Sequence, residues 1–204
     1  MTTVLITAFE PYDRWRTNAS WLTLVQLTQE LPEEPRIVTR LYPVDFAKVK
    51  QKLREDLTAG NYDYSIHLGQ APGSGRVHLE SIGLNIGGSG SQSPDQFRPL
   101  IDDGPVAYRS PLPLGEWALK LERAGVPCTM SYHAGTFLCN ATLYLACHYA
   151  QQLNLKTRSA FMHVPLDPSQ TVGQLSDQAS MPVGLGATGL RLILKEIAAI
   201  PPLA

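Results

Sequence analysis

Short hydrophobic runs alternate with longer amphipathic stretches along the whole chain. The short runs predict buried strands at 4–9, 37–44, 64–70, 77–86, 128–132 and 160–164. In the longer stretches, apolar residues recur at helical spacing, which predicts helices over 20–31, 45–57, 116–124, 138–153 and 188–199. Strands that alternate with such helices predict an α/β fold with a twisted, mostly parallel sheet and helices on both faces. We find no repeat and no linker, so we expect one domain over 1–204.

The segment 87–114 departs from this alternation. It contains the run Gly87-Gly88-Ser89-Gly90-Ser91, several prolines and few apolar residues. A long irregular segment in a compact domain is typical of a lid or a binding loop, or of local disorder. The pattern favours neither alternative.

Composition narrows the functional classes. Of 204 residues, 44% are hydrophobic and 17% charged, as in a folded globular protein, and the net charge of −1 argues against a nucleic-acid partner. The N-terminus lacks the pattern of a signal peptide, and no apolar run reaches the roughly 20 residues that span a bilayer. Three cysteines without a CxxC spacing argue against disulfides and a zinc site. We therefore expect a reduced, cytoplasmic protein with no membrane partner, no metal and no cofactor.

The ends of the predicted strands direct the search for a site. In an open α/β sheet, ligands bind beyond the carboxyl ends of the strands. Four segments rich in glycine, proline and polar residues occupy such places: those after Phe9 and Gln70, the loop before Cys139, and the segment after His163. We expect them to converge.

Cys139 falls in the first turn of the helix predicted after this loop. Unpaired backbone N–H groups at a helix N-terminus favour a thiolate and could stabilise an oxyanion. The alternative is that Cys139 is a small buried hydrophobic residue, and these considerations leave the two interpretations about equal. Cys128, within a strand, and Cys147, in mid-helix, are interpreted as structural.

A nucleophilic thiol needs a base, and the chain has five histidines. His163 is favoured because it lies at the end of a strand, where the topology places catalytic groups. His148 is nine residues beyond the cysteine and points to the opposite face of the helix. His67 and His78 lie within strands and are interpreted as packing or surface residues. His133 is close in sequence and remains a competitor.

Glu80 is a candidate third member. It lies in a half-buried strand, where a charge is costly unless it is paired. It either faces solvent, the commoner case, or accepts the Nδ1 proton of the base and fixes its tautomer.

At these residues the chain resembles the pyroglutamyl peptidase I family, also called pyrrolidone-carboxylate peptidases, which are cytosolic cysteine exopeptidases. The likeness covers almost the whole chain. It is carried by five motifs in the family's order: Thr7–Tyr12 with Asn18; Leu68–Ala71 followed by Glu80 and Asn85; Asp103–Pro105 with Ala107 and Tyr108; Ala134–Asn140; and Phe161–Pro165.

The resemblance implies an α/β/α sandwich, assembly as a homotetramer, and hydrolysis of the bond after an N-terminal pyroglutamyl residue of peptides. It assigns the catalytic triad to Cys139, His163 and Glu80. It also implies a pyroglutamyl-ring site, with aromatic walls and contacts to the lactam from residues of these motifs: Phe9, Tyr12, Trp15, Asn18, Gln70 and Leu138.

The departures from the family pattern affect the loops. Asp13-Arg14 replaces a Gly-Gly pair, and the active-site arginine of the family falls at Gly90. Arg76 or Arg98 could substitute for it. Three hypotheses follow: an active pyroglutamyl peptidase, a Cys-His-Glu hydrolase of another small amide, or a non-catalytic peptide-binding relative that lacks the arginine.

Overall fold

The computed structural model describes residues 1–89, 91–174 and 177–200. Within these residues, six strands form one sheet in the order β2-β1-β3-β8-β4-β7. Neighbouring strands are parallel except β4 and β8, which are antiparallel. The strands are β1 (Thr3–Phe9), β2 (Arg36–Tyr42), β3 (Tyr64–Gln70), β4 (Val77–Glu80), β7 (Cys128–Ser131) and β8 (Arg158–Val164).

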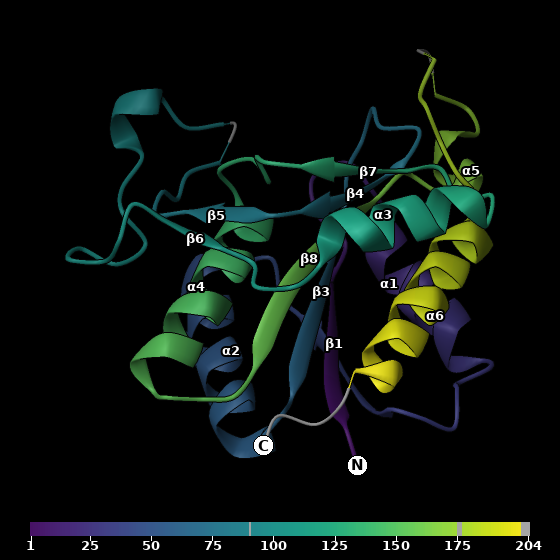
Figure 1. Cartoon of the computed structure of the whole chain (residues 1–204). Coiled ribbons are helices and arrows are strands. Elements are labelled where there is room, and N and C mark those ends of the chain that lie inside the picture. The colour runs from purple at the N-terminus through teal and green to yellow at the C-terminus, as the bar shows by residue number, and fades with distance from the viewer. Residues whose placement is uncertain (90, 175–176, 201–204) are drawn as a thin grey trace.

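Helices cover both faces of this sheet (Figure 1). One face carries α2 (Phe46–Gly60) and α4 (Leu138–Gln152), which pack on each other. The other face carries α1 (Ala19–Thr28), α3 (Leu114–Arg123) and α6 (Val183–Ala199). The short helix α5 (Pro168–Thr171) follows β8. The predicted α/β architecture with a mostly parallel sheet is confirmed.

Two hydrophobic cores follow from the alternation of side chains along the strands. In β1, Val4, Ile6 and Ala8 pack into the core beneath α1, α3 and α6. Leu5 and Phe9 enter the second core, beneath α2 and α4. A central strand buried on both faces reads as a continuous hydrophobic run, which is the pattern of residues 4–9.

The predicted strand 77–86 is wrong as a single element. The strand is interrupted at Ser81. Before it, β4 belongs to the main sheet; after it, β5 (Ile82–Leu84) forms a separate antiparallel pair with β6 (Ala107–Arg109). Gly83 of β5 lies against the backbone of α4: a Cβ there would be 2.6 Å from the nitrogen of Tyr144. The strand turns away from the main sheet to pack on this helix.

The last helix begins at Val183 rather than at 188. Its first turns contain Gly184 and Gly186. Because glycine has a low helix propensity, the sequence does not predict a helix over these turns.

The described residues of 87–114 follow a defined path. Gly87 forms a bridge with Arg98, and the Gly88 N–H donates to the Thr136 carbonyl at 2.9 Å. The Asn85 side chain holds the far part of the loop through bonds with the backbone of Leu100, Ile101 and Gly104. Gly90 lies outside the described residues.

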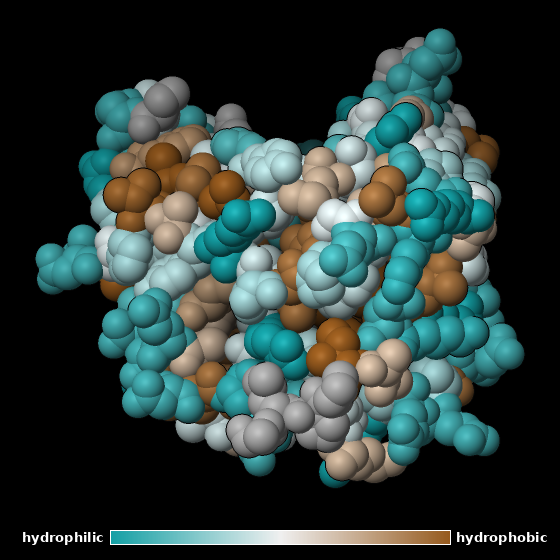
Figure 2. All heavy atoms as spheres, viewed as in Figure 1, coloured by the Kyte–Doolittle hydropathy of each residue, from teal (hydrophilic) through white to brown (hydrophobic). Residues whose placement is uncertain are grey.

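On the face shown in Figure 2, hydrophobic residues are exposed in separate groups among hydrophilic ones. None of the helices in the described part of the chain is long and apolar enough to cross a membrane.

Candidate active site

The ends of β1, β3 and β8 meet the N-terminus of α4 around a cavity of about 200 Å³. The four segments that the sequence placed at strand ends therefore do converge. The cavity is lined by Phe9, Tyr12, Asn18, Val44, Gln70, Ala134, Gly135, Thr136, Phe137, Leu138, Cys139 and His163.

Cys139 is the second residue of α4 and is partly exposed. Phe137, the N-cap residue, is extended and gives no side-chain hydrogen bond to the first turn. The N–H groups at this end of the helix thus have no side-chain cap, and the positive end of the helix dipole faces the sulfur. This setting offers backbone N–H donors to an anion that forms beside the sulfur.

The thiol lies close to strand β3 at Gly69. A Cβ at this position would be 2.7 Å from the Cys139 Sγ atom and 2.6 Å from the Phe161 ring. Only glycine leaves room for the sulfur. A glycine inside a strand often marks such a close approach, and this signal in the sequence was missed.

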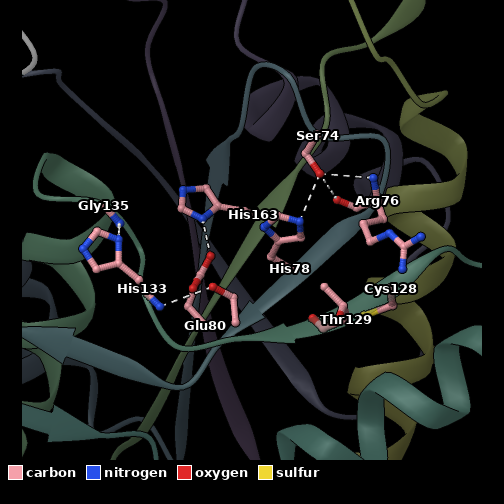
Figure 3. Close-up of polar contacts among 10 residues, drawn as sticks. Ser74, Arg76, His78, Glu80, Cys128, Thr129, His133, Gly135 and His163 are labelled. Atoms are coloured by element: carbon pink, nitrogen blue, oxygen red, sulfur yellow. Dashed lines mark hydrogen bonds and ion pairs between the residues drawn. The ribbon is translucent and has the colours of Figure 1, made fainter.

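His163, near the end of β8, hydrogen-bonds to Glu80 of β4, with 2.7 Å between Nδ1 and Oε1 (Figure 3). Glu80 is 1% exposed and His163 8%. Because Nδ1 is engaged by the carboxylate, Nε2 is the ring nitrogen that remains for Cys139, which lines the same cavity and helps to raise the pKa of this imidazole. Glu80 is therefore paired and buried rather than facing solvent.

Opposing effects set the charges of this pair. Burial alone would lower the pKa of His163, but the charge of and hydrogen bond to Cys139, together with Glu80, raise the pKa to about 10. For Glu80, burial would raise the pKa, yet the hydrogen bond and charge of His163 leave the pKa below its ordinary value, with help from Ser131. The geometry favours an imidazolium beside a carboxylate.

The competing histidine, His133, does not line the cavity. It is exposed, and its Nδ1 accepts the N–H of Gly135 at 3.2 Å (Figure 3). His148 lies on the far side of α4 against Tyr108 and Tyr144, as expected from its spacing.

Cys128 and Cys147 lie in settings that fit a structural role. Burial raises the pKa of each thiol to about 12, which disfavours the reactive thiolate.

Five of the six residues predicted at the ring site line the cavity; Trp15 does not. A turn closed by the bond from the Trp15 N–H to the Tyr12 carbonyl (3.1 Å) carries Trp15 away. It is buried in a neighbouring hollow, with the Arg14 guanidinium 4.8 Å from its ring. Asp13, in this turn, has φ 51°, a conformation that favours glycine.

Asn18 lines the cavity, but its amide is used within the protein. Oδ1 caps α1 by accepting from the Ser20 N–H at 3.0 Å, and Nδ2 donates to the Glu10 carbonyl at 2.9 Å. Asn18 therefore shapes the first loop.

Residues 134–137, in the loop expected at the site, also line the cavity, as does Val44, which was not predicted there. Phe137 packs edge-on against Phe46, with ring centroids 5.4 Å apart, which fixes this wall. Val44 lies two residues beyond the end of β2, so the strand-end rule could have found it.

Neither candidate substitute for the missing arginine lines the cavity. Arg98 Nη1 donates to the carbonyls of Asp95 and Phe97 beside a separate hollow. Arg76 is exposed. Gly90, where the family pattern has arginine, lies outside the described residues.

The arrangement contains the parts of a covalent acyl-transfer site. A thiol at a helix N-terminus lines the same cavity as an imidazole, a buried carboxylate orients that imidazole, and backbone donors lie beside the thiol. A nucleophile, a base and an orienting group in this order are the general requirement for nucleophilic catalysis.

Similarity to known proteins agrees with this geometry. The family model described as pyroglutamyl peptidase matches residues 2–199. The pyrrolidone-carboxylate peptidase of Streptomyces coelicolor is 34% identical over 207 residues, covering 98% of this chain and 94% of the relative. That of Clavibacter michiganensis subsp. michiganensis is 32% identical over 199 residues, covering 96% and 92%.

Solved structures give the same result. The pyrrolidone carboxyl peptidase of Fervidobacterium islandicum superposes with a TM-score of 0.91 at 28% identity, covering 97% of this chain and 98% of the other. That of Thermococcus litoralis has a TM-score of 0.88 at 26% identity, and both chains are covered completely.

Proposed function

Because this chain belongs to the pyroglutamyl peptidase family of cysteine peptidases, we propose that it hydrolyses the bond after an N-terminal pyroglutamyl residue of peptides. In this proposal Cys139 is the nucleophile, His163 the general base and acid, and Glu80 the group that orients His163. The observation that carries the proposal is the buried hydrogen bond that His163 Nδ1 donates to Glu80 Oε1 at 2.7 Å, beside the cavity that Cys139 lines.

The reaction proceeds through a thioester. The Cys139 thiolate attacks the carbonyl carbon, and N–H groups of the first turn of α4 stabilise the resulting oxyanion. The His163 imidazolium protonates the leaving amine as the C–N bond breaks, which leaves a pyroglutamyl thioester. His163 then takes a proton from a water molecule as its oxygen attacks the thioester. The C–S bond breaks, which releases the pyroglutamyl acid and restores the Cys139 thiolate beside the His163 imidazolium. Glu80 stays ionised and stabilises the imidazolium in both steps.

The cavity suits a small uncharged ring. Its walls include the side chains of Phe9, Tyr12, Val44 and Phe137, beside a smaller polar part of the lining. A slot with apolar walls and few polar groups selects a neutral five-membered lactam over a charged amino terminus. Backbone groups near Gln70 and Leu138 are the proposed contacts of the lactam.

The test is hydrolysis of a pyroglutamyl fluorogenic amide by the wild-type protein and by Cys139→Ser. We expect turnover that depends on Cys139. Rapid alkylation of Cys139 without turnover of this amide would point to another small amide substrate. A thiol that is alkylated no faster than an ordinary exposed one, without turnover, would refute an enzymatic role; Cys147→Ser is the matched control.

We further propose a cytoplasmic, single-domain protein that assembles as a homotetramer, on the strength of the family resemblance. Sedimentation equilibrium and a single cooperative unfolding transition would test the assembly and the domain organisation.

A further inference from the structure

The Gln70 side chain at the end of β3 is held in one orientation. Its Oε1 atom accepts two hydrogen bonds, from the Ala19 N–H at 2.7 Å and from Gln170 Nε2 at 2.8 Å. The side chain is 4% exposed. Because both lone pairs of Oε1 face donors, rotating the amide by 180° would place N–H groups against N–H groups.

Gln170 is itself locked. Its Oε1 accepts the Asp167 N–H at 2.9 Å in the capping box of α5, and its Nε2 also donates to the Thr17 carbonyl at 3.0 Å. Gln170 is 8% exposed and lies a hundred residues beyond Gln70 in the chain. Its side chain joins α5 to the first loop and fixes the direction of the Gln70 amide.

The Gln70 Nε2 group is left without an ordinary partner. It is buried, yet it makes no hydrogen bond within ordinary distance and angle limits to any described residue. A buried N–H group without a partner costs on the order of 1–3 kcal/mol, so such a group calls for an explanation. Gln70 and Tyr12 line the same cavity, and the Gln70 side chain lowers the pKa of Tyr12, which is the effect of a donor near the phenolic oxygen.

The direction of this interaction follows from the lock on Gln70. Nε2 is only a donor, so the Tyr12 oxygen is the acceptor, and the phenolic proton remains for another acceptor. Tyr12 and Cys139 line the same cavity. Burial and the negative charge of Cys139 raise the pKa of Tyr12 to about 12, although Gln70 lowers it, so the hydroxyl keeps its proton at neutral pH.

We propose that Gln170, acting through Gln70, holds the Tyr12 hydroxyl as a hydrogen-bond donor to the carbonyl oxygen of the acyl group that Cys139 attacks. Tyr12 is then a catalytic residue and Gln170 a positioning residue. The inference rests on the proposed function, because it assigns a further donor to the same reaction. Hydrogen bonds that are loose in a free enzyme commonly tighten when the transition state forms.

The carbonyl oxygen is favoured over the lactam ring because Tyr12 lines the cavity at which Cys139 lies, and negative charge develops on the oxygen next to this sulfur. Removing one oxyanion donor typically costs roughly 100- to 1000-fold in kcat. The backbone donors of α4 remain in a variant without the hydroxyl, so we expect a loss of roughly 10- to 100-fold.

The decisive variant is Tyr12→Phe, which removes one oxygen and keeps the ring. With the pyroglutamyl fluorogenic amide, kcat is expected to fall by this factor while KM changes less than about twofold. Gln170→Met is expected to lower kcat in the same direction. The double variant is expected to be no slower than Tyr12→Phe alone, because both changes remove one interaction. Gln174→Met, an exposed change after the same helix, is the matched control.

A second measurement does not depend on turnover. The aldehyde analogue of pyroglutamate adds to the thiol as a hemithioacetal, whose oxygen takes the oxyanion position. Tyr12→Phe is expected to weaken its binding by the factor lost in kcat and to leave pyroglutamate binding unchanged. If the wild-type protein does not hydrolyse the amide, the proposed function fails, and the aldehyde still tests the role of Tyr12.

Three results would overturn the inference. They are an unchanged kcat and aldehyde affinity in Tyr12→Phe, an effect on KM alone, and losses that add in the double variant. The second would place the hydroxyl against the ring in the ground state, and the third would make Gln170 a structural residue unconnected to Tyr12.

Discussion

His67 and His163 lie two pairs apart on the neighbouring strands β3 and β8, where His67 pairs with Phe161 and Gly69 pairs with His163. Both imidazoles are buried. Their charges are nevertheless controlled in opposite ways: the pKa of His67 is lowered to about 3, and that of His163 is raised to about 10.

Neutral hydroxyl groups surround His67. Ser65 Oγ donates to Ser159 Oγ at 2.8 Å, so it accepts from His67 Nε2 at 3.1 Å, and His67 Nδ1 accepts from Thr7 Oγ1 at 2.8 Å. Each ring nitrogen is satisfied in the neutral form. No charge offsets the burial, which therefore disfavours the imidazolium.

His163 is also buried, but its charge is influenced by a thiol and a carboxylate. Their negative charges outweigh the desolvation of the cation. The difference shows that burial makes a histidine neutral only where its partners are neutral. Within one sheet, the same residue type cross-links strands in one place and, in the proposed reaction, serves as the catalytic base in the other.

Glu80→Gln is expected to have the largest effect on the difference between His163 and His67. An amide keeps a partner for His163 but removes the charge, so we expect kcat to fall by roughly 1000- to 10,000-fold, as when a triad carboxylate is neutralised. Burial lowers the pKa of His163, and Cys139 and Glu80 raise it; without Glu80 the imidazolium loses its proton at lower pH. The alkaline limb of kcat/KM should therefore move to lower pH.

The measurement is the pH profile of kcat/KM for wild type and variant, with the exposed Glu116→Gln as control. The wild-type rate should fall as the pH rises toward about 10. A variant that loses activity with an unmoved alkaline limb would show that Glu80 does not act through the charge of His163.

His67→Gln is expected to affect stability rather than catalysis. Glutamine offers one donor and one acceptor but fills less space, so the free energy of unfolding at pH 7 should fall by about 1–3 kcal/mol. The folded-state pKa of His67 is depressed, so its contribution is fully present above pH 6.5 and is lost as the pH falls toward about 3. The wild-type protein should lose up to about 1.4 kcal/mol per pH unit in this range through His67.

Urea unfolding of both proteins between pH 4 and 7 tests this, because other titrating groups cancel in the difference. The stability deficit of His67→Gln should shrink as the pH falls. The exposed His133→Gln is the control and should leave the free energy of unfolding unchanged. A deficit that is constant with pH would mean that His67 does not have to be neutral in the folded state.

The sequence predicted the parts of the fold that depend on local pattern. The continuous hydrophobic runs of β1, β3 and β8 identify central strands, because these strands are buried on both faces. The break at Ser81 was not predictable, since apolar residues continue across it. The partner strand β6 has only three residues, too few for a periodic signal.

The candidate site was predictable to a similar extent. Strand-end topology brought His163 and Cys139 together, as the cavity shows. The pairing of Glu80 was not predictable from the residues alone, because its partner is 83 positions away and either strand face was open to it. Trp15 was misplaced because the turn after Tyr12 reverses the chain, which residue types do not reveal.

A third histidine, His78, tests the same comparison with a smaller expected effect. His78 lies opposite His163 in the antiparallel pair of β4 and β8, and it is only partly buried (Figure 3). Ser74 Oγ donates to the Arg76 carbonyl at 2.8 Å, so it accepts from His78 Nε2 at 3.1 Å. Burial lowers the pKa of His78, Glu80 raises it, and His163 and Arg76 lower it further, with a net decrease. His78 is thus neutral beside the charged pair.

Two substitutions separate the presence of this ring from its charge. His78→Gln keeps a donor for Ser74, and kcat/KM at pH 7 should change less than about twofold. His78→Lys places a permanent cation beside His163, which should lower the rate by roughly three- to tenfold, about 1 kcal/mol, and move the alkaline limb to lower pH. Equal effects of the two variants would show that the shape of His78, and not its neutrality, matters to the charge of His163.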